Sequence, residues 1–182
     1  MNGPGVTLWR LTVAASAATG VWLAAQQYDV WWTALSQLAN LAVAASYVGL
    51  AVREPRSPWL RGGLTSVMLL VALAYLPMAN GNLLEPWSLL EHVVTPGLVL
   101  ADFLLVGVNQ GGLRWWHPLT WLVAPAAYLG WYVAADLAVY DALDPAASGV
   151  FLARLALLLT LLLAAGFALC LAGRRRVLRL PA

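Results

Sequence analysis

A stripe of polar side chains runs through one very apolar part of the chain, the segment WWTALSQLAN. An α-helix advances about 100° per residue, so residues three or four positions apart lie on the same face. Polar groups that point into lipid go unsatisfied, and we therefore expect this stripe to face the protein interior. The stripe consists of Thr33, Ser36, Gln37 and Asn40.

A second set of polar side chains lies in the segment LLEHVVTPGLVLADF, where Glu91, Thr95 and Asp102 share one flank and His92 lies beside them. A hydroxyl beside an imidazole is the minimal nucleophile and base pair, because the hydroxyl becomes reactive when a positioned base takes its proton. Thr33 and His92 both fall near the start of spans that run in the same direction, so we expect them at the same depth. A Thr33 nucleophile with a His92 base is one interpretation of this pattern. For these residue types alone, a helix cap or an interhelical hydrogen bond is the more common one.

The elements that must position these residues are membrane-spanning helices. The chain has 182 residues, of which 62% are hydrophobic and 10% charged, and its mean hydropathy is +0.78. A helical span needs roughly 20 apolar residues, and short polar breaks separate six such stretches. The sequence therefore predicts an all-α, single-domain bundle, with no soluble catalytic or nucleic-acid-binding domain. We expect spans near residues 6–26, 32–52, 59–80, 89–108, 116–137 and 149–172.

The distribution of charge predicts an orientation. All ten basic residues are arginines, and those outside the spans fall in alternate connections and in the tail, whereas the other connections carry only acidic residues. Because basic residues favour the cytoplasmic side, we expect both termini in the cytoplasm and the protein in the plasma (inner) membrane. Membrane lipids are the expected partners, nucleic acid is not, and the sequence indicates no oligomeric state.

The remaining polar residues have structural or pocket-lining interpretations. Asp102 is expected to pair with Arg10 or Arg61, because buried charges in a membrane seek partners. Arg154 is expected to pair with Glu91 or Asp136. Ser36, Gln37, Asn40, Glu91, Thr95, Asp136 and Tyr140 are expected to line a pocket. The two His and the single Cys show no metal-ligand spacing, and the proposed chemistry requires no metal or organic cofactor.

Several short motifs follow one another along the chain: Trp32-Thr33 with Ser36, LRGGLT, LLEHVV leading to Asp102, Pro125 with Tyr128, YDALDP, and Arg154. In their order and spacing, the sequence resembles the androgen-induced protein family, whose vertebrate members are membrane threonine hydrolases, and more closely its bacterial six-helix relatives. The resemblance implies that Thr33 is the nucleophile and His92 its partner. It also implies lipid ester substrates, such as fatty acid esters of hydroxy fatty acids.

Another class of function fits the same polar residues. A small transporter or ligand-binding membrane protein would use polar stripes to line a path or cavity, and would use intramembrane carboxylates to carry protons or bind solute. A structural subunit that presents its helices to a partner is a third alternative. The hydrolase is the interpretation favoured here.

Overall fold

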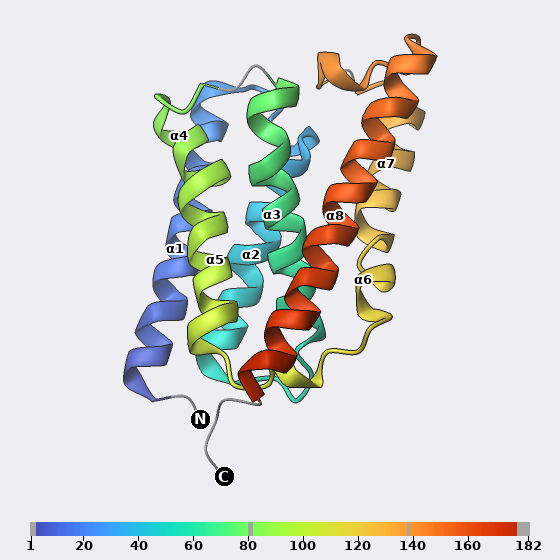
Figure 1. Cartoon of the computed structure of the whole chain (residues 1–182). Helices are drawn as coiled ribbons and strands as arrows, with labels where there is room; N and C mark the ends of the chain where they lie inside the picture. The colour runs from blue at the N-terminus through green and yellow to red at the C-terminus, as the bar shows by residue number, and fades with distance from the viewer. Residues whose placement is uncertain (1–2, 80–81, 138, 178–182) are drawn as a thin grey trace.

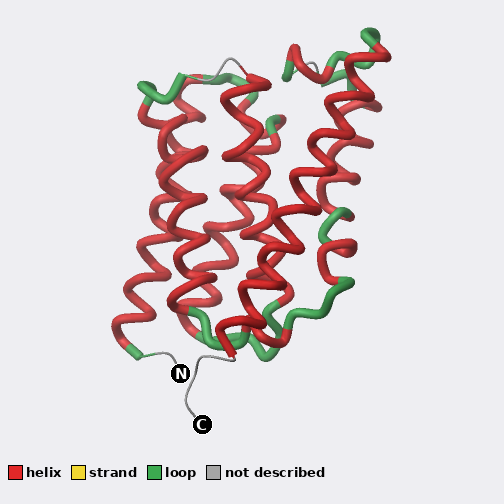
Figure 2. The backbone as a smooth tube through the Cα atoms, viewed as in Figure 1, coloured by secondary structure: helices red, strands yellow, loops and turns green. Residues whose placement is uncertain are grey.

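A computed structural model describes residues 3–79, 82–137 and 139–177, and within these ranges the chain is helical and has no β-strand (Figures 1 and 2). In this part of the chain, four helices are long and apolar enough to cross a membrane. This agrees with a polytopic helical membrane protein. The four are α1 (Pro4–Gln27), α2 (Leu35–Val52), the composite helix Pro86–Val106, and α8 (Ser148–Val177), of which Ser148–Arg175 is the apolar part.

The second expected span begins later than the sequence predicted. Instead of one helix from residue 32, the chain forms a short 3₁₀ turn, η1 (Trp31–Thr33), and then an extended residue, Ala34, before α2 begins at Leu35. Thr33 therefore lies outside the helix whose face was used to predict its direction.

The composite helix Pro86–Val106 contains two π-helical turns. It consists of α4 (Pro86–Leu89), the π-helical turn η2 (Leu90–Val94), α5 (Thr95–Ala101) and the π-helical turn η3 (Asp102–Val106). Pro96 has no N–H to donate, which frees carbonyl groups in the preceding turn. The Asn40 amide of α2 lies 3.5 Å from one of these, the Glu91 carbonyl, as its donor. The widened turn η2 carries Glu91 and His92.

The fifth expected span, 116–137, is not one continuous helix. It consists of α6 (His117–Thr120) and α7 (Val123–Ala134), separated at Trp121 and Leu122. Pro125 contributes to the break because it cannot donate to the carbonyl of residue 121. The chain leaves α7 through Asp136, whose φ of 48° lies in the left-handed region common after helix C-termini. This turn lets the Leu137 N–H donate to the Tyr132 carbonyl of the last helical turn at 3.1 Å. Short turns η4 (Gln110–Gly112) and η5 (Asp141–Leu143) and the helix α3 (Trp59–Ala79) complete the fold.

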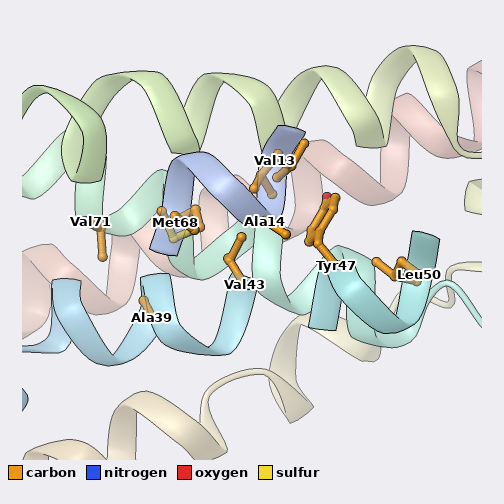
Figure 3. Close-up of a cluster of buried hydrophobic side chains, with 10 residues drawn as sticks. Val13, Ala14, Ala39, Val43, Tyr47, Leu50, Met68 and Val71 are labelled. Carbon is orange, nitrogen blue, oxygen red and sulfur yellow. The ribbon is translucent and has the colours of Figure 1, made fainter. Parts of the chain in front are cut away.

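The helices form one bundle in which α1 begins and α8 ends at the same end (Figure 1). We call this the terminal end, and the end that holds η1, α4 and η5 the opposite end. Figure 3 shows the core that joins α1, α2 and α3, in which Ala14 and Val43 lie near Met68. Small residues such as Ala14 and Ala39 let helices approach closely, and close packing rather than the hydrophobic effect holds helices together in lipid.

Four charged side chains meet at the terminal end and form what we call the charge cluster. The Asp102 carboxylate lies 3.3 Å from Arg10 Nε and 3.5 Å from Arg61 Nε. Glu54, in the linker between α2 and α3, pairs with both arginines. Arg10, Arg61 and Asp102 are fully buried. Two positive and two negative charges thus neutralise one another, as buried charges require.

The charge cluster also binds the backbone and a hydroxyl of α2. Arg10 donates to the Leu50 carbonyl at 2.8 Å, and the Tyr47 hydroxyl donates to Asp102 at 3.4 Å. The sequence predicted that Asp102 pairs with Arg10 or Arg61; the structure pairs it with both, and adds Glu54, which the sequence reading did not include. Arg154 lies half-buried in α8.

Gly107 gives a test of this packing. It follows η3 directly, and a Cβ at this position would overlap the Arg61 guanidinium, which the charge cluster holds in place. We expect Gly107→Ala to lower the free energy of unfolding by about 1–3 kcal/mol, the usual cost of overpacking. Thermal unfolding in detergent, followed by circular dichroism, measures the effect. Gly130→Ala is the control, because a Cβ there meets nothing within 4 Å; equal melting temperatures of the two variants would contradict the prediction.

Candidate functional site

A cavity of about 420 Å³ lies between α3, α7 and α8 and reaches the start of α2. Its volume falls in the usual range for small-molecule sites, about 300–1,000 Å³. Most of its wall is aliphatic, which suits a hydrocarbon chain. The wall is made by Leu35, Ser36, Leu70, Val71, Ala74, Tyr75, His92, Leu122, Pro125, Ala126, Tyr128, Leu129, Tyr140, Leu143, Leu155, Ala156, Leu158, Leu159 and Leu162.

His92 is held by two contacts that leave one ring nitrogen available. Its Nδ1 lies 2.9 Å from the Ser88 carbonyl oxygen, which only accepts hydrogen bonds, so Nδ1 carries a hydrogen. In the neutral ring, the other nitrogen, Nε2, is then the basic one. The imidazole also stacks on Tyr75, with ring centroids 3.6 Å apart. The Tyr75 hydroxyl is fixed in turn by Ser88 Oγ at 2.7 Å.

Two tyrosines from distant parts of the chain hold the start of α2. The Tyr140 hydroxyl accepts the Leu35 N–H at 2.9 Å, and the Tyr128 hydroxyl donates to the Thr33 carbonyl at 2.9 Å. Leu35 is the first residue of α2, so its N–H has no acceptor within the helix, and Tyr140 supplies one. Burial raises the pKa of Tyr140, which keeps its hydroxyl protonated.

A chain of hydrogen bonds leads from the cavity wall into the bundle. The Ser36 hydroxyl donates to Gln37 Oε1 at 3.1 Å, and Gln37 Nε2 donates to the Glu91 carboxylate at 3.0 Å. Gly20 of α1 makes room for this carboxylate, because a Cβ there would lie 3.0 Å from Glu91 Cγ. Gln37 and Glu91 are buried, and this bond gives a partner to Gln37 Nε2 and to one of the two Glu91 carboxylate oxygens.

The structure divides the predicted pocket residues into two groups. Ser36, His92 and Tyr140 line the cavity. The others lie off its wall: Gln37, Asn40 and Glu91 bond within the bundle, and Thr95 Oγ1 lies 2.8 Å from Ser16 Oγ of α1. Asp136 ends α7 with an exposed side chain. Helical periodicity correctly identified the buried polar residues within the helices, but not Thr33, which is half-buried. It also did not distinguish side chains that face a cavity from those that face another helix.

Thr33 lies next to the cavity without contributing its side chain to the wall. Its hydroxyl donates to the Val30 carbonyl at 3.0 Å, and Thr33 is not among the described residues that line the cavity. Its backbone carbonyl is bound by Tyr128, a wall residue. The pairing of Thr33 with His92 therefore remains a prediction. Ser36, three residues after Thr33, has a hydroxyl and lines the same cavity as His92.

The sequence reading omitted Tyr75 and Tyr128 from the site. Both tyrosines lie inside apolar spans, where a hydroxyl needs a hydrogen-bond partner. This requirement is the feature of the sequence that could have identified them as site residues. Comparison with protein-family models, curated proteins and solved structures finds no match for this chain.

Proposed function

We propose that this protein is an intramembrane hydrolase of lipid esters. The observation that carries the proposal is the cavity, whose aliphatic wall ends at an imidazole and a hydroxyl, those of His92 and Ser36. The hydrocarbon part of a lipid would occupy the aliphatic part, with its ester group at the polar end. Fatty acid esters of hydroxy fatty acids, implied by the family resemblance, are one such substrate class.

In the proposed reaction, His92 acts as the general base through Nε2. It takes the proton of a hydroxyl while that oxygen attacks the ester carbonyl, and then gives the proton to the departing alcohol. Water, deprotonated by the same nitrogen, releases the acid and restores the hydroxyl. The Ser88 carbonyl supports this role because it binds Nδ1–H and leaves Nε2 unprotonated.

The nucleophile comes from the start of α2 in this proposal. Thr33 has the support of the family resemblance, and Ser36 has the support of the cavity wall. Either hydroxyl must exchange its present acceptor, the Val30 carbonyl for Thr33 or Gln37 for Ser36, to reach His92. Catalytic hydrogen bonds often form only when substrate is bound.

A lipid-directed fluorophosphonate probe tests this proposal on the purified protein. We expect covalent labelling of the parent and its loss in only one of Thr33→Ala and Ser36→Ala, which identifies the attacking hydroxyl. Thr160→Ala is the control, since this exposed threonine on α8 donates to the Ala156 carbonyl away from the polar end. Labelling that persists in Thr33→Ala, in Ser36→Ala and in the double variant would reject the proposed nucleophiles.

A lipid-binding or transport protein is the second candidate. One observation favours it: neither Thr33 nor Ser36 bonds to His92, since each hydroxyl donates elsewhere. Saturable binding of a lipid ester, with no release of acid over long incubation, would support this candidate over the hydrolase.

We also propose six spans with both termini in the cytoplasm of the plasma (inner) membrane, with α3 and the broken segment α6–α7 as the further two. Asp29 and Arg56 lie exposed in connections at opposite ends of the bundle. In a Cys170→Ala background, we expect a membrane-impermeant maleimide to label Asp29→Cys in intact cells and Arg56→Cys only after permeabilisation. The reverse pattern would invert the orientation, and labelling of both in intact cells would contradict it.

A further inference from the structure

The polar end of the cavity offers no charge to a ligand. Among the described residues that line the cavity, none is an Arg, Lys, Asp or Glu. The lining residues that carry polar groups are Ser36, Tyr75, Tyr128 and Tyr140, each with a hydroxyl, and His92 with its imidazole. The Tyr75 hydroxyl accepts a hydrogen bond from Ser88 Oγ at 2.7 Å. An anionic head placed there would lose its hydration without gaining an opposite charge, which is unfavourable in an apolar surrounding.

The hydrogen of Ser36 is already used. Glu91 requires a donor from Gln37, and Gln37 Nε2 supplies it at 3.0 Å. This fixes the orientation of the Gln37 amide and turns its oxygen toward Ser36, so the serine hydroxyl donates at 3.1 Å. Ser36 therefore offers its oxygen lone pairs, and no hydrogen, to a molecule in the cavity.

The same holds for two other groups at this end. The Nδ1–H of His92 is bound to the Ser88 carbonyl at 2.9 Å, which leaves Nε2 as an acceptor in the neutral ring. The Tyr128 hydroxyl donates to the Thr33 carbonyl at 2.9 Å and keeps only lone pairs free. Three hydrogen-bond acceptors thus lie along the wall of an aliphatic cavity without an opposing charge. The Tyr140 hydroxyl, which accepts the Leu35 N–H at 2.9 Å, is the fourth polar group and still carries its own hydrogen.

We propose that the cavity selects lipids with an uncharged head that carries free hydroxyl groups. For the hydrolase proposed above, on which this substrate assignment rests, the preferred esters have a polyol as their alcohol part, as in a monoacylglycerol. The hydroxyls of the head donate to Ser36 and His92, and the acyl chain occupies the aliphatic part. Esters whose alcohol part carries a carboxylate are poorer ligands at this position. They include the fatty acid esters of hydroxy fatty acids that the family resemblance implies, so this assignment ranks polyol esters ahead of that class.

Binding without chemistry tests the head preference. The experiment measures how well each of three non-hydrolysable lipids competes with a fluorescent lipid for the purified protein. The three have the same alkyl chain and are an alkylglycerol ether, the alkyl methyl ether, and an alkoxy acid with a free carboxylate. We expect the glycerol ether to bind about tenfold more tightly than the methyl ether, since donors satisfy the buried acceptors. We expect the alkoxy acid to bind most weakly at neutral pH. Equal binding of the two uncharged ethers, or tightest binding of the alkoxy acid, would overturn the assignment.

Turnover of the matching esters separates this inference from the proposed function. Hydrolysis of the monoacylglycerol ahead of the methyl ester, with the carboxylate-bearing ester slowest, supports both. Preference for the glycerol ether in binding without any ester hydrolysis supports the head assignment and rejects the hydrolase. Hydrolysis of all three esters at equal rates, with equal ether binding, rejects the head assignment and leaves the hydrolase in place.

Ser36→Ala is the variant that tests the acceptor directly. We expect it to weaken binding of the glycerol ether while the methyl ether binds as before, so that the ratio between them falls toward one. Thr160→Ala, which removes an exposed hydroxyl of α8, should keep the parent ratio. A Ser36→Ala protein that retains the full preference would show that Ser36 does not bind the head.

Discussion

Replacing His92 by glutamine is expected to reduce ester hydrolysis by roughly 100- to 10,000-fold, the range in which general acid–base catalysis contributes. Glutamine keeps a polar side chain of similar reach but has no nitrogen that takes up a proton near neutral pH. The imidazole is held for this role by the Ser88 carbonyl at Nδ1 and by the Tyr75 ring on its face. Release of fatty acid from a lipid ester, measured on purified protein in detergent, gives the rate.

The second histidine supplies a matched control. His117 begins α6 at the terminal end, where its Nδ1 accepts the Arg114 N–H at 3.2 Å, and it does not belong to the cavity wall described above. We expect His117→Gln to hydrolyse esters at close to the parent rate. If His92→Gln keeps the parent rate while its binding of lipid is unchanged, His92 is not the base. Lipid binding retained in an inactive His92→Gln protein shows that the loss is chemical rather than structural.

Replacing Asp102 by asparagine is expected to destabilise the protein by about 3–5 kcal/mol, the usual cost of removing one partner from a buried ion pair. The change leaves Arg10 and Arg61, both fully buried, with only the half-buried Glu54 to balance them. It also weakens the bond from Tyr47. Thermal or denaturant-induced unfolding in detergent measures the loss. Asp141→Asn, an exposed acid at the opposite end, is the control.

A double variant separates charge imbalance from a general loss of packing. Arg10→Met combined with Asp102→Leu removes one charge of each sign and leaves Arg61 paired with Glu54. Since apolar replacement of a whole buried pair is often neutral or stabilising, we expect this protein to be more stable than Asp102→Asn. A double variant that is less stable than Asp102→Asn would show that packing at this site, rather than unbalanced charge, sets the loss.

The sequence by itself determined that the protein is helical and approximately where several of its helices begin. Apolar stretches of membrane-spanning length, with polar breaks between them, predicted helices that the structure begins near the expected residues, as at Pro4, Trp59 and Ser148. The sequence also predicted that the polar stripe and Asp102 would be buried. Ser36, Gln37, Asn40 and Asp102 are buried, whereas Thr33, which precedes α2, is only half-buried. These features follow from local periodicity and from the cost of polar groups in lipid.

Only the tertiary structure decided which polar residues reach the cavity. The direction assigned to Thr33 assumed a helix continuous from residue 32, but Ala34 is extended, with ψ of 142°, so Thr33 does not follow the phase of α2. Ser36, inside α2, does follow it and lines the cavity. Whether a buried side chain meets a cavity or a neighbouring helix depends on how the helices are placed, which periodicity within one helix does not contain.

The partners of the site residues also depended on long-range packing. Tyr140 binds the Leu35 N–H and Tyr128 binds the Thr33 carbonyl across about half the chain length. Glu54 joins Arg10 and Arg61 from a linker that the sequence reading treated only as a connection. From hydrophobicity and charge it follows that buried polar and charged groups need hydrogen-bond or ion-pair partners. The three-dimensional arrangement of the helices decides which residues are those partners.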